Sequence, residues 1–493
     1  MRFWTAIGLI TVLSATGLTY EIAAGRVLAP FFGTSLLTWT TVIATVLAGF
    51  SLGNAIGGLL AERERRAALR GVRAALIATA VLAALSPLVL GLLYSWGARG
   101  TGGMLLSVIL AFFPASVLIS APSPLLAKLA VEARPGREGS SLGLVLAAGS
   151  LGAIFGAVLA GFVALPLAGS AATFAGCAVA ALLCVPFLRG DRDGGGDGRK
   201  AGQDGESLAV LVPVGLLVAA SLAIGPVCRY ESGLSCIDVV QRGGAVYLYA
   251  DRTSQAAERS APAATADPEA SALVLPYTQW LWARMDRDLG PAPAVLFIGG
   301  GGYTLPTQLL TARPDASAIA VEIDPLVTEV VRRHLPWAGE ILARAGYDAA
   351  AGPQGDGRLG IVHEDGRVYL NETDRRFDAA VMDAFSSGSV PAHLVTRETY
   401  ERLREIVTGP VYVNLIDTPD GSLARGTHAI LSGLYPHVTA VRGPTGPRGL
   451  GNIVLAASDR PLGPLDLLPD GYAETRISPG RAFTDDRGWV GHR

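Results

Sequence analysis

Three acidic positions in the C-terminal half of the chain each follow a short apolar segment of the strand type. The pairs are 318–321 with Glu322, 360–362 with Asp365, and 377–382 with Asp383. In a parallel α/β sheet the carboxyl ends of the strands meet at one edge, where such folds bind their ligands. One of these acids alone could be a solvated loop residue or a helix cap. The set of three predicts a shared crevice lined by carboxylates.

A run of four glycines, 299–302, follows the buried apolar segment 294–298 and precedes a predicted helix. Glycines let a ligand approach the backbone closely, and the start of a helix offers unpaired N–H groups. Glu322 lies about 20 residues further on, where an acid binds ribose hydroxyls. The run lacks the dehydrogenase spacing G-x-G-x-x-G and a Walker lysine. It therefore favours a site of the S-adenosylmethionine type over one for NAD or ATP.

Other segments of this half must position the crevice. Three further elements are predicted, namely a hairpin of strands 236–240 and 245–250 around Gly243-Gly244, a helix at 277–287, and a fifth sheet strand at 411–415. The segment 256–272, rich in Ala, Pro and Ser, predicts a mobile loop. Together these elements predict a Rossmann-like α/β domain preceded by a small β-hairpin region.

The N-terminal half has the composition of a membrane protein. Hydrophobic residues make up 50% of the chain and charged residues only 17%, whereas soluble domains are about a quarter charged. Crossing a bilayer takes about 20 apolar residues, and seven segments fit: 3–28, 36–60, 69–96, 104–131, 141–167, 171–188 and 208–224. We therefore expect a multipass α-helical bundle of about seven spans in the cell (inner) membrane.

Details of these segments add two expectations about their packing. Three prolines are expected to kink or break the fourth segment, Pro114, Pro122 and Pro124. Two glycine pairs have the four-residue spacing that suits close helix packing in lipid, Gly53/Gly57 and Gly152/Gly156. A glycine-rich chain contains such pairs in any case. The Gly- and Asp-rich segment 191–206 predicts a flexible linker between the sixth and seventh spans.

Charge, cysteine and histidine usage exclude several other classes of protein. Lys and Arg number 40 against 42 Asp and Glu, so the net charge of -2 gives no support for binding nucleic acid. The four cysteines form no C-x-x-C motif, and the six histidines are scattered without the spacing of metal ligands. We therefore expect no metal. The lipid bilayer and a small molecule are the expected partners, and self-association into a homo-oligomer is left open.

Residues 231–493 resemble the polyamine aminopropyltransferase (spermidine synthase) family, a branch of the class I methyltransferase-like fold. The matching sequences are Glu231-Ser232, Asp251-x-x-x-Gln255, Tyr277, VLFIGGGG (295–302), VEID (321–324), EDGR (364–367) and DAFSSGSVPAHLVTRETY (383–400). The N-terminal half resembles the membrane region of fused transporter-like/spermidine-synthase-like proteins, chiefly in TYEIAAGRVLAPFFG (19–33). Thr484-Asp485-Asp486 also recurs in that fused group.

The resemblance implies a role for each matching residue. Glu322 would hold the ribose of the donor and Asp365, followed by Gly366, the adenine amino group. The glycines Gly299, Gly300 and Gly301 would pass beneath the sulfonium end. Asp383 would be the catalytic carboxylate, which takes a proton from the attacking amine. Four residues would shape the acceptor cleft together with Asp383, namely Glu231, Asp251, Gln255 and Tyr277.

The implied function is that of an integral-membrane aminopropyltransferase. It would transfer an aminopropyl group from decarboxylated S-adenosylmethionine to a polyamine or another amine. Three departures from the family weaken electrostatic recognition of a polyamine, because they replace acids: Gly302 after the three glycines, Thr278-Gln279 after the tyrosine, and Ser386 after the catalytic Asp. Two alternatives stay open. One is a membrane-tethered methyltransferase that uses S-adenosylmethionine, and the other is a non-catalytic transporter or sensor that binds polyamines or nucleosides.

The expected organisation is a transmembrane helical domain over 1–226, a small β-rich part over 227–290, and the catalytic domain over 291–493. Thirteen Lys and Arg residues lie on one side of the predicted spans and only Arg99 on the other. The positive-inside rule then puts the N-terminus in the cytoplasm, and seven spans put the catalytic domain outside.

A donor made in the cytoplasm argues for the opposite side, because it is a permanent cation and cannot cross lipid unaided. We favour the outward side on the loop charges; otherwise one segment does not span. A disulfide between Cys228 and Cys236 would fit an oxidising compartment, and two free thiols would explain this pair equally well.

Overall fold

The computed structural model describes residues 2–33, 36–188, 212–222, 228–260, 272–353, 355–385, 390–446 and 449–487. The predicted linker 191–206 and most of the predicted loop 256–272 lie outside these residues. The chain divides into two compact units, Met1–Cys236 and Ile237–Arg493. We describe each unit by itself, and the finer domain boundaries near residues 227 and 291 remain a proposal.

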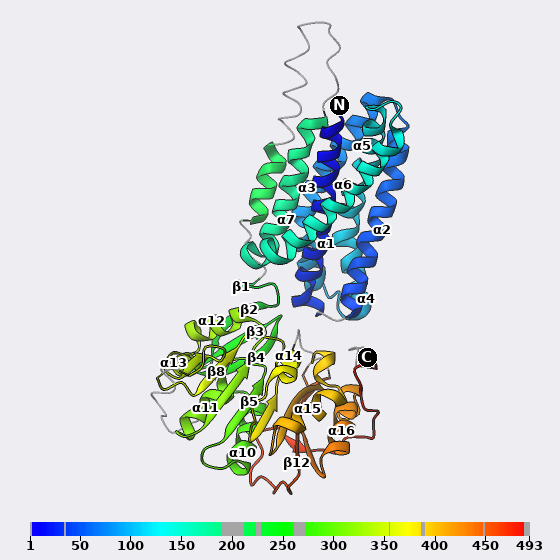
Figure 1. Cartoon of the computed structure of the whole chain (residues 1–493). Helices are drawn as coiled ribbons and strands as arrows, with labels where there is room; N and C mark the ends of the chain where they lie inside the picture. Colours follow the sequence, from blue (N-terminus) through cyan, green and yellow to red (C-terminus); the bar gives the residue numbers. More distant parts are fainter. Residues whose placement is uncertain are drawn as a thin grey trace. The chain divides into compact units, whose positions relative to one another are not determined.

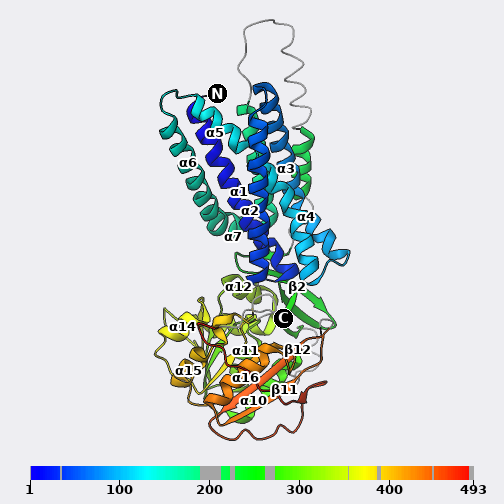
Figure 2. The same ribbon diagram turned by 90° about the vertical axis from the view of Figure 1, so that its right-hand side faces the viewer.

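Long helices make up most of the first unit, and Figures 1 and 2 show them lying side by side. Their bounds are α1 Phe3–Phe32, α2 Leu36–Ala61, α3 Arg65–Ser95, α4 Gly100–Ser120, α5 Pro122–Glu132, α6 Glu138–Leu159, η1 Ala160–Ala164, α7 Leu165–Cys184 and η2 Val185–Leu188. The fourth predicted span comprises α4, which ends at Ser120, and α5, which begins with Pro122, and Ala121 between them keeps helical dihedral angles (φ -55°, ψ -30°). Pro114 lies inside α4.

Within the described residues, five helical stretches are long and apolar enough to cross a membrane, judged by length and composition. They are Phe3–Phe32, Leu37–Ala61, Arg65–Ser95, Gly100–Glu132 and Glu138–Leu188. The last stretch contains the fifth and sixth predicted spans, and a non-helical residue, Gly169 (φ 77°, ψ 175°), interrupts it. The described part of the seventh predicted span, 208–224, is a shorter apolar helix, Val212–Leu222. Seven spans therefore remain a prediction.

Both glycine pairs lie where two helices approach each other closely. A Cβ atom built on Gly152 or Gly156 of α6 would lie 2.3 Å from Thr11 O or 2.1 Å from Ala15 O of α1. Gly53 and Gly57 of α2 approach the α4 backbone and Ala121, just after α4, in the same way, at 2.0 and 2.2 Å. Any side chain at these positions would push the helices apart, so these glycines set the interhelical distance.

A disulfide bond joins Cys228 and Cys236. Its loop carries Glu231 and Ser232. The hydroxyl of Ser170 donates a hydrogen bond to the Glu231 carboxylate, and Arg26 of α1 donates through Nε to the carbonyl of Ser232 at 3.2 Å. The sequence allowed either a disulfide or two free thiols at this pair, and the structure has the disulfide.

A small antiparallel sheet follows, in the order β1-β2-β3-β4. Its strands are β1 Tyr230–Glu231, β2 Cys236–Arg242, β3 Ala245–Ala250 and β4 Thr253–Arg259. The predicted hairpin is confirmed: Gly243 and Gly244 both have positive φ, as a type I′ turn requires. The predicted loop from residue 256 is wrong at its start, because Ala256 and Ala257 are buried in β4. Pairing of β4 with β3 outweighs the loop-like composition.

The second unit is built on a mixed sheet whose described strands run in the order β13-β11-β12-β10-β9-β5-β6-β8-β7. Their bounds are β5 Ala294–Ile298, β6 Ser317–Val321, β7 Gly346–Asp348, β8 Leu359–Val362, β9 Ala379–Met382, β10 Val411–Asp417, β11 His437–Arg442, β12 Gly451–Ser458 and β13 Ala473–Glu474. Neighbouring strands within the part β10-β9-β5-β6-β8-β7 are parallel. Strand β12 runs antiparallel to both β10 and β11. The five predicted sheet strands correspond to β5, β6, β8, β9 and β10, which are parallel. The β11–β12 hairpin, which was not predicted, returns the chain beside β10 and makes the sheet mixed.

Helices cover both faces of this sheet, as Figure 1 shows. One group comprises α10 Pro276–Asp288, α11 Thr304–Ala312, α12 Pro325–His334 and α13 Pro336–Arg344, and the other α14 Gly366–Glu372, η3 Ala392–Leu394, α15 Arg397–Ile406 and α16 Ser422–Leu434. Apolar side chains of α14, α15 and α16 pack with those of the central strands in one core cluster. The sheet is Rossmann-like, with its central strand β5 paired to β6 on one side and β9 on the other.

Candidate active site

The strand order places two predicted site segments next to each other. After β5 the chain moves outward to β6 and β8 and then returns to β9 on the other side of β5, which is the switch point where such sheets bind ligands. The glycine run follows β5 and Asp383 follows β9, and Asp383 N donates to Ile298 O at 2.9 Å. Gly299 has a φ of 99°, and a Cβ there would lie 2.4 Å from the carbonyl oxygen of Asp383. Only glycine allows this approach.

Glu322, just after β6, reaches back to the glycine run. Its Oε2 accepts hydrogen bonds from the N–H groups of Gly300 and Gly301 at 3.0 and 3.2 Å, and Oε1 accepts from Asp324 N at 3.0 Å. Burial raises the pKa of the Glu322 carboxyl to about 7, against the effect of these three donors. Each carboxylate oxygen accepts about two hydrogen bonds, so one acceptor position remains, on Oε1, for a ribose hydroxyl.

Asp365, after β8, has two local contacts. Its Oδ1 caps helix α14 by accepting from Arg367 N at 2.8 Å and Val368 N at 3.3 Å. Its Oδ2 lies 2.9 Å from Nε2 of His393. The side chain is 29% exposed, so a ligand has access to it. Asp365 is therefore a helix cap and still has an acceptor position on Oδ2 for an adenine amino group.

Asp383 is held from two sides by neutral donors. Asn414 Nδ2 donates to Oδ1 at 2.8 Å, and the hydroxyl of Tyr277 donates to Oδ2 at 3.2 Å. Asn414 is itself oriented by Asn452, whose Nδ2 donates to Asn414 Oδ1 at 3.0 Å. The carbonyl of Gln255 in β4 is a second acceptor for the Tyr277 hydroxyl, at 3.3 Å. These contacts bring together Gln255, Tyr277 and Asp383, three of the predicted acceptor-site residues.

Burial raises the pKa of the Asp383 carboxyl to about 7, although the Asn414 and Tyr277 hydrogen bonds act to lower it. Burial, followed by the charge of Asp383, raises the pKa of the Tyr277 hydroxyl well above its usual value, so Tyr277 remains a donor at neutral pH. A carboxyl with a pKa near 7 suits general base catalysis, because its ionised form is present at neutral pH and is also basic enough to take a proton. The arrangement can hold a nucleophile and deprotonate it.

The roles of the other two predicted acceptor-site residues stay predictions. Asp251 is buried in the turn between β3 and β4 and has a positive φ of 47°, a conformation that Asp tolerates better than most residues. Glu231 belongs to the first unit, where Ser170 donates to its carboxylate.

Two of the three family departures have a structural cause. A Cβ on Gly302 would lie 2.2 Å from that of Ala256, so an acidic side chain has no room there. The hydroxyl of Thr278 donates to Leu275 O at 2.7 Å, and Gln279 Nε2 donates to Leu273 O at 3.1 Å. These side chains fix the start of α10. The third departure, Ser386, lies outside the described residues.

The sequence analysis missed Asn414, Asn452 and His393. Asn414 had a signal, since it is the one polar residue in the apolar segment 411–415, and a polar side chain inside a buried strand needs a partner. His393 lies within the family-like sequence 383–400, but nothing there relates it to Asp365. Asn452 had no signal, because nothing in its local sequence relates it to Asn414. Among the described residues, no cluster of three or more His, Cys, Asp or Glu side chains is arranged to hold a metal ion.

Comparison with known sequences finds polyamine aminopropyltransferases among the relatives of this chain. The chain is 27% identical over 193 residues to a polyamine aminopropyltransferase of Vibrio vulnificus, a match covering 38% of this chain and 54% of that relative. It is 30% identical over 119 residues to a polyamine aminopropyltransferase of Saccharolobus solfataricus, covering 24% and 36%. The chain thus spans about half the length, or less, of these curated relatives. No family model matches it.

Among solved structures, the chain is similar to a probable spermidine synthase from Corynebacterium glutamicum, with a TM-score of 0.43 and 17% identity over 55% of this chain and 99% of that one. It is also similar to spermidine synthase from Thermotoga maritima, with a TM-score of 0.35 and 20% identity over 48% and 72%. The curated relatives confirm the predicted resemblance to polyamine aminopropyltransferases. Membership of the membrane-fused branch stays a prediction.

Proposed function

We propose, for a chain related to the polyamine aminopropyltransferases, that the second unit transfers an aminopropyl group from decarboxylated S-adenosylmethionine to an amine. One observation carries the proposal. Asp383 lies half-buried at the end of β9, directly beside the glycine run, and its two oxygens accept hydrogen bonds from Asn414 and Tyr277. A carboxylate at this place can meet an amine aligned with a donor that lies over the glycines.

The donor half of the site rests on Glu322 and Asp365. Glu322 offers carboxylate oxygens at the glycine run, where the ribose hydroxyls of a nucleoside would bind. Asp365 offers an acceptor to the adenine amino group. The two acids follow adjacent parallel strands, β6 and β8, so they face one nucleoside from two points. The sulfonium end then lies toward the glycines and Asp383.

The chemistry of the proposed reaction is a displacement at carbon. The amine lone pair attacks the aminopropyl carbon next to the sulfonium sulfur, the C–S bond breaks, and sulfur keeps that electron pair in 5′-methylthioadenosine. The amine nitrogen becomes a cation and releases its proton to a carboxylate oxygen of Asp383. Holding the two reactants in line supplies much of the acceleration, and a positioned base contributes typically about 10²–10⁴-fold.

A second candidate, methyl transfer from S-adenosylmethionine, is favoured by the structural cause of the departures. Ala256 leaves no room for an acid at Gly302, and Thr278 and Gln279 are engaged in fixing α10. These acids would have paired with cationic groups of the donor tail and the diamine.

We also propose that the first unit spans the cell membrane and that the second faces outward. Five apolar helices of sufficient length and the excess of Lys and Arg on one side of the predicted spans support this. The Cys228–Cys236 disulfide adds support, because disulfides persist in oxidising compartments and are rare in the cytosol. An outward enzyme needs its donor brought across, and the helical bundle is the part of the chain available for that.

Mass spectrometry of reaction products tests the proposal. The purified protein is incubated with decarboxylated S-adenosylmethionine or S-adenosylmethionine and a panel of amines. We expect an aminopropylated amine with 5′-methylthioadenosine from the first donor, at a rate that falls about 10²–10⁴-fold in Asp383→Asn. A methylated product would select the second candidate. No product from either donor, with nucleoside binding intact, would leave the binding-only alternative.

A further inference from the structure

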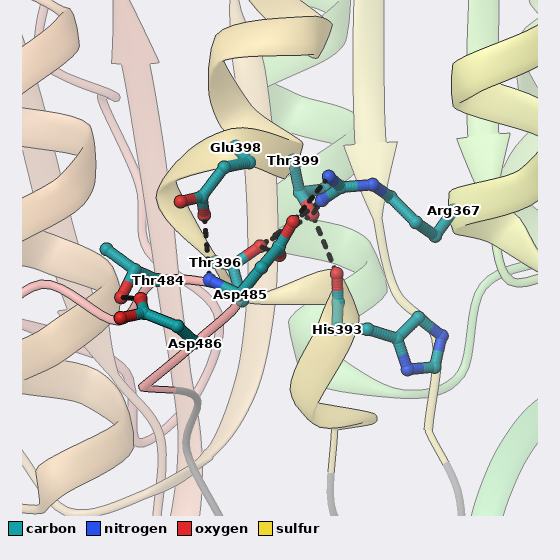
Figure 3. Close-up of polar contacts among 8 residues, drawn as sticks. All are labelled: Arg367, His393, Thr396, Glu398, Thr399, Thr484, Asp485 and Asp486. Atoms are coloured by element: carbon teal, nitrogen blue, oxygen red, sulfur yellow. Dashed lines mark hydrogen bonds and ion pairs between the residues drawn. The ribbon is translucent and has the colours of Figure 1, made fainter.

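The C-terminal segment 483–487 contacts two helices of the second unit, α14 and α15, through Asp485 (Figure 3). The Asp485 carboxylate accepts hydrogen bonds from the Arg367 guanidinium of α14 at 3.0 Å and from the hydroxyl of Thr396, which precedes α15, at 2.7 Å. Its backbone N–H donates to Glu398 of α15 at 3.1 Å. The segment therefore ties the starts of α14 and α15 together.

The contacts of Asp485 continue toward the donor site. The Arg367 guanidinium, which Asp485 holds, also donates to the hydroxyl of Thr399. The Thr399 hydroxyl donates in turn to the carbonyl of His393 at 2.7 Å, as Figure 3 shows. The His393 ring lies 2.9 Å from Oδ2 of Asp365, and the backbone N–H of Arg367 donates to Oδ1 of the same residue at 2.8 Å.

We propose that Asp485 is a positioning residue for donor binding. It holds Arg367 and, through Thr399, the His393 turn, so that Asp365 presents its remaining acceptor position in one direction. This inference rests on the proposed function, in which Asp365 accepts the adenine amino group.

The geometry explains why such positioning is needed. His393 lies in η3, a turn of three residues, and an isolated 3₁₀ turn of this length has little stability of its own. Its ring is 48% exposed and Asp365 is 29% exposed, so the two side chains are only partly packed, although Leu394 of the same turn is buried in the core. Hydrogen bonds from the Thr399 hydroxyl and from the backbone N–H groups at the start of α14 also hold the pair.

Stability alone does not account for Asp485. The Asp485 side chain is 51% exposed, and exposed ion pairs add little to folding stability. We therefore expect Asp485→Asn to fold and unfold like the wild type. Asp486→Asn is a matched control, because the Asp486 carboxylate accepts from the Thr484 hydroxyl of its own segment at 2.6 Å and has no part in the chain of contacts to Asp365.

The test measures two affinities of the full-length protein by calorimetry. One ligand is 5′-methylthioadenosine, and the other is its analogue without the 6-amino group. We expect Asp485→Asn to bind 5′-methylthioadenosine about 3- to 10-fold more weakly, which is part of the roughly 10- to 100-fold that a hydrogen bond to a charged group is worth. Its affinity for the desamino analogue should stay unchanged, as should both affinities of Asp486→Asn.

Three results would be adverse, and they can be told apart. If Asp485→Asn binds both ligands more weakly by the same factor, the role of Asp485 is merely structural and the inference is overturned. If Asp365→Ala loses the preference for the 6-amino group while Asp485→Asn and Thr399→Val keep it, the inference fails and the donor site stands. If Asp365→Ala keeps the preference, the donor assignment within the proposed function fails. Thr399→Val is the second variant. It leaves the Asp485 carboxylate unchanged, and it should change the two affinities in the same way as Asp485→Asn.

Discussion

Substitution of Asn414 by Leu is expected to move the pH dependence of the reaction rather than abolish it. Asn414 donates to Asp383 at 2.8 Å and stabilises its ionised form, while burial raises the pKa of that carboxyl to about 7. A hydrogen bond to a charged group contributes about 1.5–3 kcal/mol, and one pKa unit corresponds to about 1.36 kcal/mol. Loss of Asn414 should therefore raise the pKa of Asp383 by about 1–2 units.

The sign follows from the role of the carboxylate as a base. Asp383 must be ionised to accept a proton, so activity rises with pH through its pKa. At pH 7 about half of the wild type is ionised, and in Asn414→Leu about 1–10%, so the variant should be about 5- to 50-fold slower there and recover near pH 10.

The assay is kcat/KM for the amine between pH 6 and 10 at saturating donor. The pKa of the amine itself is common to both proteins, so it cancels in their ratio. Asp383→Asn serves as the control and should be slow at every pH. A profile of Asn414→Leu that is lowered uniformly, with the wild-type midpoint, would refute the reasoning and assign Asn414 to positioning alone. A wild-type profile that is flat between pH 6 and 8 would show that the base is another group.

Three further predictions concern binding, stability and topology. Glu322→Ala should weaken 5′-methylthioadenosine binding by about 10- to 150-fold in calorimetry, and unchanged affinity would contradict the ribose role. Burial raises the pKa of the Glu258 carboxyl, which is 0% exposed, to about 7. Because the folded protein then holds this proton more tightly than the unfolded chain does, Glu258 contributes on the order of 3 kcal/mol to folding stability below pH 4.5, and this contribution is lost as pH rises through 7. The unfolding temperature should accordingly fall between pH 5 and 8, and less steeply in Glu258→Gln. A cysteine at Asp466, which is 97% exposed, should react with a membrane-impermeant maleimide in intact cells, and labelling only after lysis would place the second unit in the cytoplasm.

The donor side of the site was largely predictable from the sequence. The acids Glu322, Asp365 and Asp383 and the run 299–302 each adjoin an apolar segment, and strand, turn and acid are local signals that survive in the fold. The acceptor side of the site was less predictable from the sequence. Tyr277 contacts both Gln255 and Asp383 only because α10 and β4 approach the end of β9, an approach that no local pattern encodes. Their grouping came from the family resemblance.

The sequence by itself determined the apolar helices, five of the parallel strands and the acids that follow three of them, because these depend on periodicity and composition over a few residues. Only the tertiary structure decided the order of strands across the sheet, and with it the surroundings of each acid. Asn414 meets Asp383 because β10 lies beside β9, where Val413 pairs with Met382. The link from Asp485 to Arg367 likewise joins residues 118 positions apart. Contacts of this kind arise from chain segments that pack together after distant loops close, so the residues involved carry no mark of each other in the sequence.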